Sequence, residues 1–241
     1  MFAGYMLYYI LGIVMIPGII MGIWAQTKVI STFNKYNKIE TKNGKSAKDV
    51  ARNMLDGGGC QDTKIQSIRG ELTDNFNPQN NTVSLSDSVY NQSTVAAVGV
   101  AAHEIGHVFQ HKAKYKPIQI RSALVPVVNI SNFLVWPLIM IGLIMELSFH
   151  ATQAMWLIYV GIGLFAMSTI FSLVTLPVEL NASKRAYKML TATGEMDKEE
   201  GEGVKKVLNA AAWTYVAGLI TSILSLVRLI MFIFIARGDR N

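Results

Sequence analysis

The chain has 241 residues, of which 51% are hydrophobic and 16% are charged, against roughly 25% charged residues in ordinary soluble domains, so its composition argues against a soluble globular protein. Its single cysteine, Cys60, excludes an intramolecular disulfide framework and a zinc site built on two cysteines. The formal net charge of +6 comes without a nucleic-acid-binding motif, and because its lysines border apolar stretches we interpret it as attraction to an anionic membrane surface.

The first predicted element is an apolar stretch at residues 2–25, which contains no charged residue. A transmembrane helix needs about 20 apolar residues to cross a hydrocarbon core of roughly 30 Å, so this stretch is long enough. No basic region precedes it, and it is longer than the apolar part of a signal peptide, which has about 7–15 residues. We therefore expect a retained transmembrane anchor at residues 1–25.

A short helix is predicted at Ala47–Leu55. Ser46 and Asp49 have the spacing of a capping box, and the glycines at 57–59 favour a helix end. The tripeptide Leu55-Asp56-Gly57 also resembles the one in intramembrane site-2 proteases, where the aspartate binds zinc and follows an H-E-x-x-H motif. Here it precedes such a motif and lies in a polar stretch, so we interpret Asp56 as part of the helix end.

Residues 63–86 have a β pattern. Ile65, Ser67 and Leu72 begin it, residues 77–81 give a strong turn signal, and Thr82–Ser86 alternates polar and apolar side chains. We expect a small sheet beside the helix that follows. Such a strand can also pair with an extended peptide through its backbone. The sequence leaves open the alternative that the sheet only covers the helix.

The next predicted element is a helix at residues 93–113 that carries the run His103-Glu104-Ile105-Gly106-His107. Residues 95–102 are small and apolar without a proline, which is compatible with an uninterrupted helix. Ser93 is the expected N-cap, and Lys112 suits the C-terminal end.

The spacing of this run predicts a zinc site. Residues four apart on an α-helix lie on the same face, so His103 and His107 can bind one Zn²⁺ ion through imidazole nitrogens. Glu104 follows the first ligand directly, where its carboxylate can reach the attacking water rather than the metal and take its proton as general base. The alternative is a chance pattern on a core helix, and the clustering of three of the four histidines at 103–111 argues against it.

His111 completes that cluster but is not expected to bind the same ion. It lies two turns from His103, about 12 Å along the helix axis, which is too far for all three histidines to share one metal. We predict either a supporting contact to a ligand or a surface position for His111.

Three more apolar stretches follow, at residues 124–145, 151–178 and 210–236, and each is long enough to cross a membrane. Arg228, the one charged residue in them, should face protein, water or a headgroup. The absence of a polar relay in these sequences argues against a transporter. The expected layout is an anchor at 1–25, a catalytic segment at 26–123, two transmembrane helices at 124–178, a second polar segment at 179–209 and a fourth transmembrane helix at 210–236.

The basic residues predict the orientation. Of the 22 Lys and Arg residues, 13 lie in the segment 26–123 and 6 in the segment 179–209, and none lies in the short link around Phe149. Short polar segments rich in Lys and Arg stay in the cytoplasm. We therefore expect a multi-pass protein of the cell membrane, with both polar segments and the H-E-x-x-H helix facing the cytoplasm.

A catalytic zinc site of this kind needs a third protein ligand. No acidic residue lies between His107 and Glu146, and Glu146 lies at the far end of a predicted span. Glu179 directly follows the span that returns the chain to the side of the H-E-x-x-H helix. A helix starting near Pro177 would place Glu179 in its first turn and Ser183 one turn later on the same face. We predict Glu179 as the third ligand, with an ordinary interfacial carboxylate as the alternative.

Residues 91–110 and 177–183 resemble the YugP-like family of neutral zinc metallopeptidases of bacterial membranes, and the similarity covers most of the chain. More distantly, the plan is similar to HtpX and CAAX prenyl protease type I, where Glu-x-x-Ala-Asp follows the membrane helices. Glu179 and Ala182 match that pattern, but Ser183 stands where the aspartate would be. The usual carboxylate support of a histidine ligand is therefore missing.

From these patterns we expect a mainly α membrane protein with about four transmembrane helices and a small cytoplasmic α+β zinc-peptidase domain. One Zn²⁺ per chain would be held by His103, His107 and Glu179, and Glu104 would act as the base in peptide-bond hydrolysis. The predicted partners are the lipid bilayer and a protein or peptide substrate that is itself membrane-associated, and no nucleic acid.

Two questions stay open at the level of the sequence. A non-catalytic membrane scaffold or chaperone-like subunit with a structural metal is the alternative function, although structural zinc sites usually have four protein ligands and only three are apparent here. An oxyanion-stabilising group is also needed, and the sequence does not choose among four candidates. These are Arg121, Tyr187, Arg185 and His111.

Overall fold

The structure is a computed structural model that describes residues 12–149 and 152–238. It is mainly helical with one small sheet, and its contacts divide it into two compact units. The first unit consists of Met1–Trp24, Ile120–Leu176 and Tyr215–Asn241, and the second consists of Ala25–Gln119 and Pro177–Thr214. We call them the apolar unit and the polar unit.

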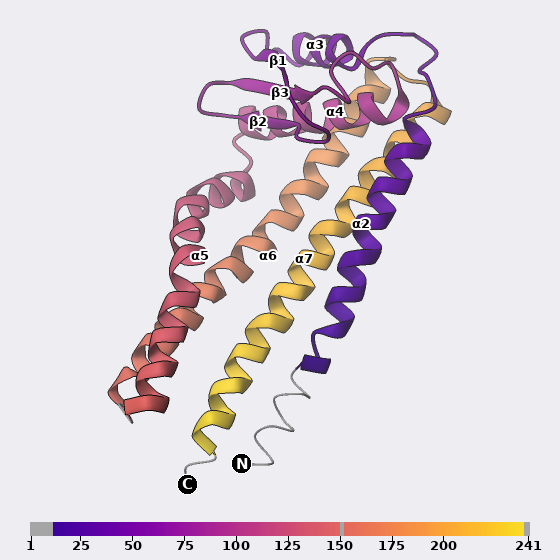
Figure 1. Cartoon of the computed structure of the whole chain (residues 1–241). Helices are drawn as coiled ribbons and strands as arrows, with labels where there is room; N and C mark the ends of the chain where they lie inside the picture. The colour runs from indigo at the N-terminus through magenta and orange to yellow at the C-terminus, as the bar shows by residue number, and fades with distance from the viewer. Residues whose placement is uncertain (1–11, 150–151, 239–241) are drawn as a thin grey trace. The chain divides into compact units, whose positions relative to one another are not determined.

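Long helices dominate the described residues (Figure 1). They are α2 (Ile16–Tyr36), α3 (Ala47–Gly57), α4 (Val95–Lys112), α5 (Lys116–Phe149), α6 (Met155–Ala192) and α7 (Lys198–Gly238), with a 3₁₀ turn at Thr152–Ala154.

Three of these helices are long and apolar enough to cross a membrane, within the part of the chain that was searched. The candidate spans are Lys116–Glu146, Met155–Ala192 and Lys198–Met231, which cover most of the predicted stretches after residue 120. The described structure thus supports three spans where the sequence predicted four. The first predicted span, 2–25, begins among residues 1–11, which lie outside the described residues, so it stays a prediction.

The apolar unit has features that are typical of helices in a lipid bilayer. Side-chain hydrogen bonds connect its helices pairwise, as is common where small and polar residues pack membrane helices together. They join Ser168 to Asn132 (α6 to α5, 2.8 Å), Thr169 to Ser222 (α6 and α7, 2.8 Å) and Thr221 to the Gly18 carbonyl (α7 to α2, 3.4 Å). Large apolar side chains point outward instead, and Phe133 on α5 is 78% exposed. Such a surface suits lipid better than water.

In the polar unit, helix α3 begins as predicted. The Ser46 side chain accepts a hydrogen bond from the Asp49 N–H, so Ser46 is the N-cap. The helix continues to Gly57, two residues further than predicted, and Gly59 adopts a φ of +68° that favours glycine. Asp56 forms an ion pair with Arg52 one turn earlier, at 2.7 Å, which agrees with its interpretation as part of the helix end.

The predicted small sheet is present. It contains β1 (Lys64–Ile68), β2 (Asn75–Asn77) and β3 (Thr82–Ser86) in the order β1-β3-β2. The central strand β3 pairs parallel with β1 and antiparallel with β2, and all five of its residues are buried. Strand β2 therefore has β3 on one side only within this sheet.

Two details of the β prediction were wrong. Leu72 was expected in a strand, but its φ of +53° places it in a tight turn before β2. Residues 75–77 were not predicted as a strand because two of the three are asparagines. Asp74 explains why they pair with β3, since its carboxylate accepts hydrogen bonds from the backbone N–H and hydroxyl of Ser86 at 2.8 and 2.9 Å.

Helix α4 lies within one or two residues of its predicted bounds, but its cap differs. Thr94 is the N-cap, with its hydroxyl accepting from the Ala97 N–H at 3.3 Å. Ser93, the predicted cap, donates its hydroxyl to Glu40 instead. The α4 helix ends at Lys112, as its basic last turn suggested.

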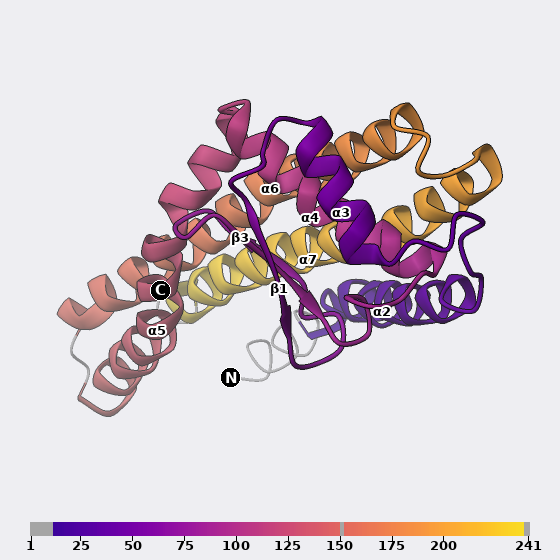
Figure 2. The same ribbon diagram turned by 90° about the horizontal axis from the view of Figure 1, so that it is seen from above.

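Small residues let α4 pack tightly at the centre of the polar unit. Ala97, Ala101 and Ile105 are fully buried, and α3 lies over α4 (Figure 2). A Cβ atom at Gly106 would lie only 2.4 Å from the Ala182 carbonyl oxygen on α6. Glycine is therefore required inside the H-E-x-x-H run, because the backbone of α6 approaches the helix there.

No helix starts near Pro177, contrary to the sequence prediction. Pro177 lies inside α6, which is continuous from Met155 to Ala192. Proline removes one backbone hydrogen bond from a helix, but helices with long apolar stretches tolerate this loss when neighbouring groups pack against them. The consequence for Glu179 and Ser183 is unchanged, because residues four apart still share one face of α6.

Candidate metal centre

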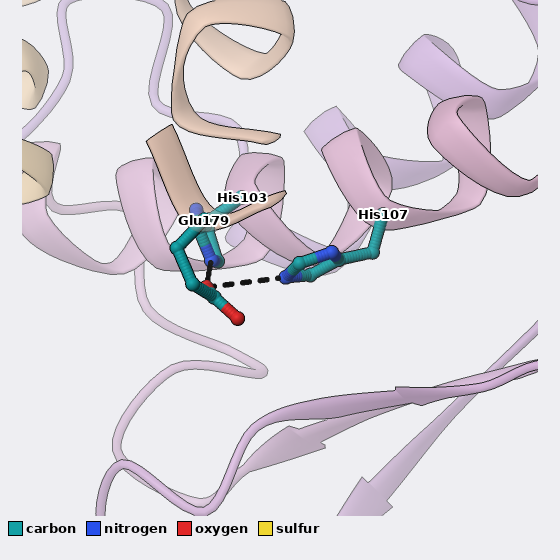
Figure 3. Close-up of side chains that lie close together, drawn as sticks. All are labelled: His103, His107 and Glu179. Atoms are coloured by element: carbon teal, nitrogen blue, oxygen red, sulfur yellow. Dashed lines mark hydrogen bonds and ion pairs between the residues drawn. The ribbon is translucent and has the colours of Figure 1, made fainter. Parts of the chain in front are cut away.

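Three side chains from two helices converge in the polar unit. His103 and His107 project from α4, and Glu179 projects from α6 toward both imidazoles (Figure 3). The Glu179 Oε2 atom lies 3.1 Å from His103 Nε2 and 3.5 Å from His107 Nε2. All three donor atoms lie within 4.8 Å of one another.

The donor set and its spacing fit a zinc ion. In a tetrahedral site with zinc-ligand distances near 2.0–2.1 Å, neighbouring ligand atoms lie about 3.3 Å apart. The two distances from Glu179, 3.1 and 3.5 Å, bracket that value. Two imidazole nitrogens and one carboxylate oxygen form a ligand set typical of catalytic zinc. The three residues predicted as metal ligands are thus brought together, with side-chain exposures of 16%, 10% and 4%.

The other ring nitrogen of His103 contacts Ser183. The distance from His103 Nδ1 to Ser183 Oγ is 3.1 Å, so the hydroxyl can accept the Nδ1 proton and leave Nε2 free to bind a metal. This is the position where the Glu-x-x-Ala-Asp pattern has its aspartate. A serine hydroxyl therefore stands where the pattern has a carboxylate, and it is neutral where a carboxylate would be charged.

His107 is held by a longer chain of hydrogen bonds. The fully buried Gln110 donates its amide to the Val178 carbonyl at 2.7 Å and to Asn181 Oδ1 at 3.1 Å. Because a carbonyl can only accept, the amide oxygen of Gln110 must face His107 Nδ1, 3.0 Å away. His107 therefore carries its proton on Nδ1 and presents Nε2 as the ligand atom. Arg185 extends the chain, donating from Nε to Asn181 Oδ1 at 2.7 Å.

Glu104 is buried, at 8% exposure, and is not one of the three clustered donors. Burial raises the pKa of its carboxyl, the imidazoles of His103 and His107 oppose this change, and the carboxylates of Glu179 and Asp74 add to it. Glu104 thus lies next to His103 on α4, in a buried position. That position suits a base that acts beside a metal.

His111 is a surface residue, one of the two roles expected for it. It is exposed, and its ring meets Phe76 of β2 edge to face with centroids 6.0 Å apart. Arg185, an oxyanion candidate, already donates to Asn181 and lies 5.8 Å from the ring of Tyr115.

Gln110 and Asn181 were missed by the sequence reasoning. Gln110 lies three residues after His107 in the run H-E-x-x-H-x-x-Q, which places its side chain one turn from the ligand. That spacing was visible, but a glutamine on a helix is usually a solvated residue. Gln110 can support His107 because α6 lies close to α4 and supplies two acceptors for the Gln110 amide.

Comparisons with known proteins agree with this geometry. The profile of a family described as "Putative neutral zinc metallopeptidase" matches residues 11–234. The chain is also 40% identical over 221 residues to the "Putative membrane protease YugP" of Bacillus subtilis (strain 168), an alignment that covers 92% of this chain and 95% of that protein. No solved structure matches the chain. The resemblance expected from the H-E-x-x-H and Glu179 segments is confirmed, and the chain belongs to this family of neutral zinc metallopeptidases.

Proposed function

We propose that this chain is a membrane-embedded zinc endopeptidase that hydrolyses peptide bonds of membrane or membrane-proximal proteins. The observation that carries this proposal is the cluster of His103, His107 and Glu179, of which the last two are buried, with Glu104 buried but outside the cluster. A structural zinc site usually has four protein ligands, whereas this cluster has three. A three-ligand site favours catalysis over the scaffold alternative.

The residues of the chain account for the proton transfers of hydrolysis. Zinc bound at the three donors would supply a Lewis acid that polarises the scissile carbonyl and makes a water more acidic. Glu104 takes a proton from that water as its oxygen attacks the carbonyl carbon. When the carbon-nitrogen bond breaks, Glu104 delivers the proton to the leaving amine and returns to its ionised form. Ser183 and Gln110 hold the two imidazoles in the tautomer that keeps Nε2 available.

The free side of β2 supports the first of the two roles considered for the sheet. Strand β2 is an edge strand, and it packs against α4 rather than against β1. An edge strand offers unpaired backbone N–H and C=O groups, which an extended peptide can use. We place the substrate backbone along β2, so that its peptide bonds pass the metal ligands on α4.

The direct test measures metal and turnover together. Zinc analysis of the purified full-length protein in detergent should give one ion per chain, and the same preparation should cleave an unfolded protein substrate. Zinc without cleavage of a panel of unfolded and membrane-derived substrates would favour the scaffold alternative.

The hydrogen bonds of Gln110 lead to a prediction on metal affinity. Gln110→Ala removes the partner of His107 Nδ1 and the hydrogen bond that ties this side chain to the Val178 carbonyl of α6. Loss of a hydrogen-bond partner of a metal ligand typically lowers metal affinity by about 10–100-fold. Competition with a chelator should therefore show a zinc dissociation constant raised by that factor, with Gln119→Ala, an exposed residue of α5, as the matched control. An unchanged zinc dissociation constant in Gln110→Ala would show that Gln110 does not support His107 as a ligand.

We also propose that the metal centre faces the cytoplasm, as the distribution of Lys and Arg indicates. In a Cys60→Ala background, a cysteine at the exposed position Gln79 should be protected from an impermeant thiol reagent added to intact cells. A cysteine at Thr152, at the start of the third predicted span, should react. Permeabilised cells are the control, in which both cysteines should react. The reverse labelling pattern in intact cells would invert the orientation.

A further inference from the structure

We infer that a pocket beside α4, lined by Phe76, Pro78, Val108 and His111, receives an uncharged apolar side chain of the peptide substrate. This inference rests on the proposed peptidase function and names a feature of its substrate. The pocket has a volume of about 340 Å³ and lies between the C-terminal half of α4, the turn after β2 and the loop that contains Cys60. Its lining also includes Gly59, Cys60, Asp62, Thr63, Asn81 and Lys112.

The position of the pocket follows from the metal ligands. Val108 is the residue after His107, and His111 lies one helical turn further, which is about 6 Å along the axis of α4. An extended peptide rises about 3.3 Å per residue. A substrate chain lying along β2 with its scissile bond at the ligands would thus bring a side chain to this pocket within about two residues of that bond.

The walls of the pocket favour an apolar occupant. Phe76 and His111 present an edge-to-face ring pair, and Val108 and Pro78 add aliphatic surface. Aromatic and aliphatic walls of this kind bind apolar side chains by removing their surface from water.

The charged groups of the lining are already engaged. The Lys112 ammonium donates to the carbonyls of Gly58 and Gly59, both at 2.7 Å. The Asp62 carboxylate accepts from the Asn81 amide at 2.9 Å. A charged substrate side chain would lose water here without gaining a dedicated partner, and the two opposite charges do not select for either sign.

Equilibrium binding to the full-length Glu104→Gln protein in detergent tests the inference without depending on turnover. The probes are fluorescent hexapeptides that differ at one position, which carries Phe, Ala, Lys or Glu, and this position is scanned along the peptide. We expect one position at which Phe binds at least about tenfold more tightly than Ala, Lys or Glu, the discrimination usual for an apolar pocket.

Val108→Phe should fill the pocket and abolish that preference, whereas Val29→Phe on α2, which does not line the pocket, should keep it. Because Val108→Phe could disturb folding, Phe76→Ala provides a second test: a wider pocket should shift the preference from Phe toward Trp. Zinc content reports whether each variant is folded.

The outcomes separate this inference from the proposed function. A Phe preference that Val108→Phe and Phe76→Ala both leave unchanged would overturn it, as would binding with no preferred position or no peptide binding at all. Cleavage by the wild-type chain without any such preference would support the peptidase proposal and contradict the inferred role of the pocket. A pocket-dependent preference without cleavage would support the pocket and count against the peptidase proposal.

Discussion

Replacing Glu104 by glutamine is expected to leave the zinc content unchanged and to lower the peptidase rate by about 10²–10⁴-fold, the usual contribution of general acid–base catalysis. Glu104 is not among the three clustered donor atoms, so the metal should stay bound. Glutamine has nearly the same shape and preserves the packing of this buried position, but its amide cannot take a proton from water. Metal analysis and initial rates should be measured on the same preparation.

A matched control is Glu195→Gln, which changes another buried glutamate of the polar unit. Glu195 accepts hydrogen bonds from Asn43 and Asn53 and pairs with Lys45 at 3.0 Å, away from the metal ligands. This variant should keep both zinc and rate. Full activity of Glu104→Gln would exclude Glu104 as the base. Loss of zinc together with rate would instead give Glu104 a role in metal binding.

The local part of the candidate site could be predicted from the sequence because its spacing is helical. His103 and His107 share a face of α4 in any straight helix, and residues 95–102 have no helix breaker. The cap was wrongly assigned to Ser93 instead of Thr94, since both residue types are good N-caps. The choice depends on Glu40, which lies 53 positions earlier and accepts a hydrogen bond from the Ser93 hydroxyl. Ser93 is therefore not available as the cap.

The sheet could be predicted only in outline. Strand β3 has alternating side chains and pairs on both sides, so its sequence carries a clear signal. Strand β2 has three residues and depends on β3 and on the side chain of Asp74. Its existence is a tertiary effect, and this is why the edge strand beside α4 had no signature of its own.

The contacts between α4 and α6 were the hardest to foresee. Glu179 was predicted because the zinc site needs a third ligand on the same side of the membrane as the H-E-x-x-H helix. That argument uses only the order of the apolar stretches in the sequence. The Gln110–Asn181 hydrogen bond joins residues 71 positions apart and could not be inferred in that way. Gly106 is the one signal that was present, because a glycine inside an otherwise regular helix suggests a close approach of another backbone.

Replacing Glu179 is expected to abolish zinc binding and proteolysis together. Its Oε2 atom lies within 3.5 Å of both imidazole Nε2 atoms, and its side chain is 4% exposed. Glu179→Ala removes one of three ligands and should weaken zinc binding by more than the about 10–100-fold expected for a supporting residue such as Gln110. Glu179→Gln keeps the shape but removes the charge, and should weaken binding as well.

Chelator competition and proteolysis should be measured for both variants, with Glu146→Ala as the control. Glu146 directly follows the predicted span 124–145, is 9% exposed and belongs to the apolar unit, so its loss should change neither quantity. Tightly held, stoichiometric zinc in Glu179→Ala would refute Glu179 as a ligand. Asp74 should then be tested first, because it directly precedes β2, the strand that packs against α4.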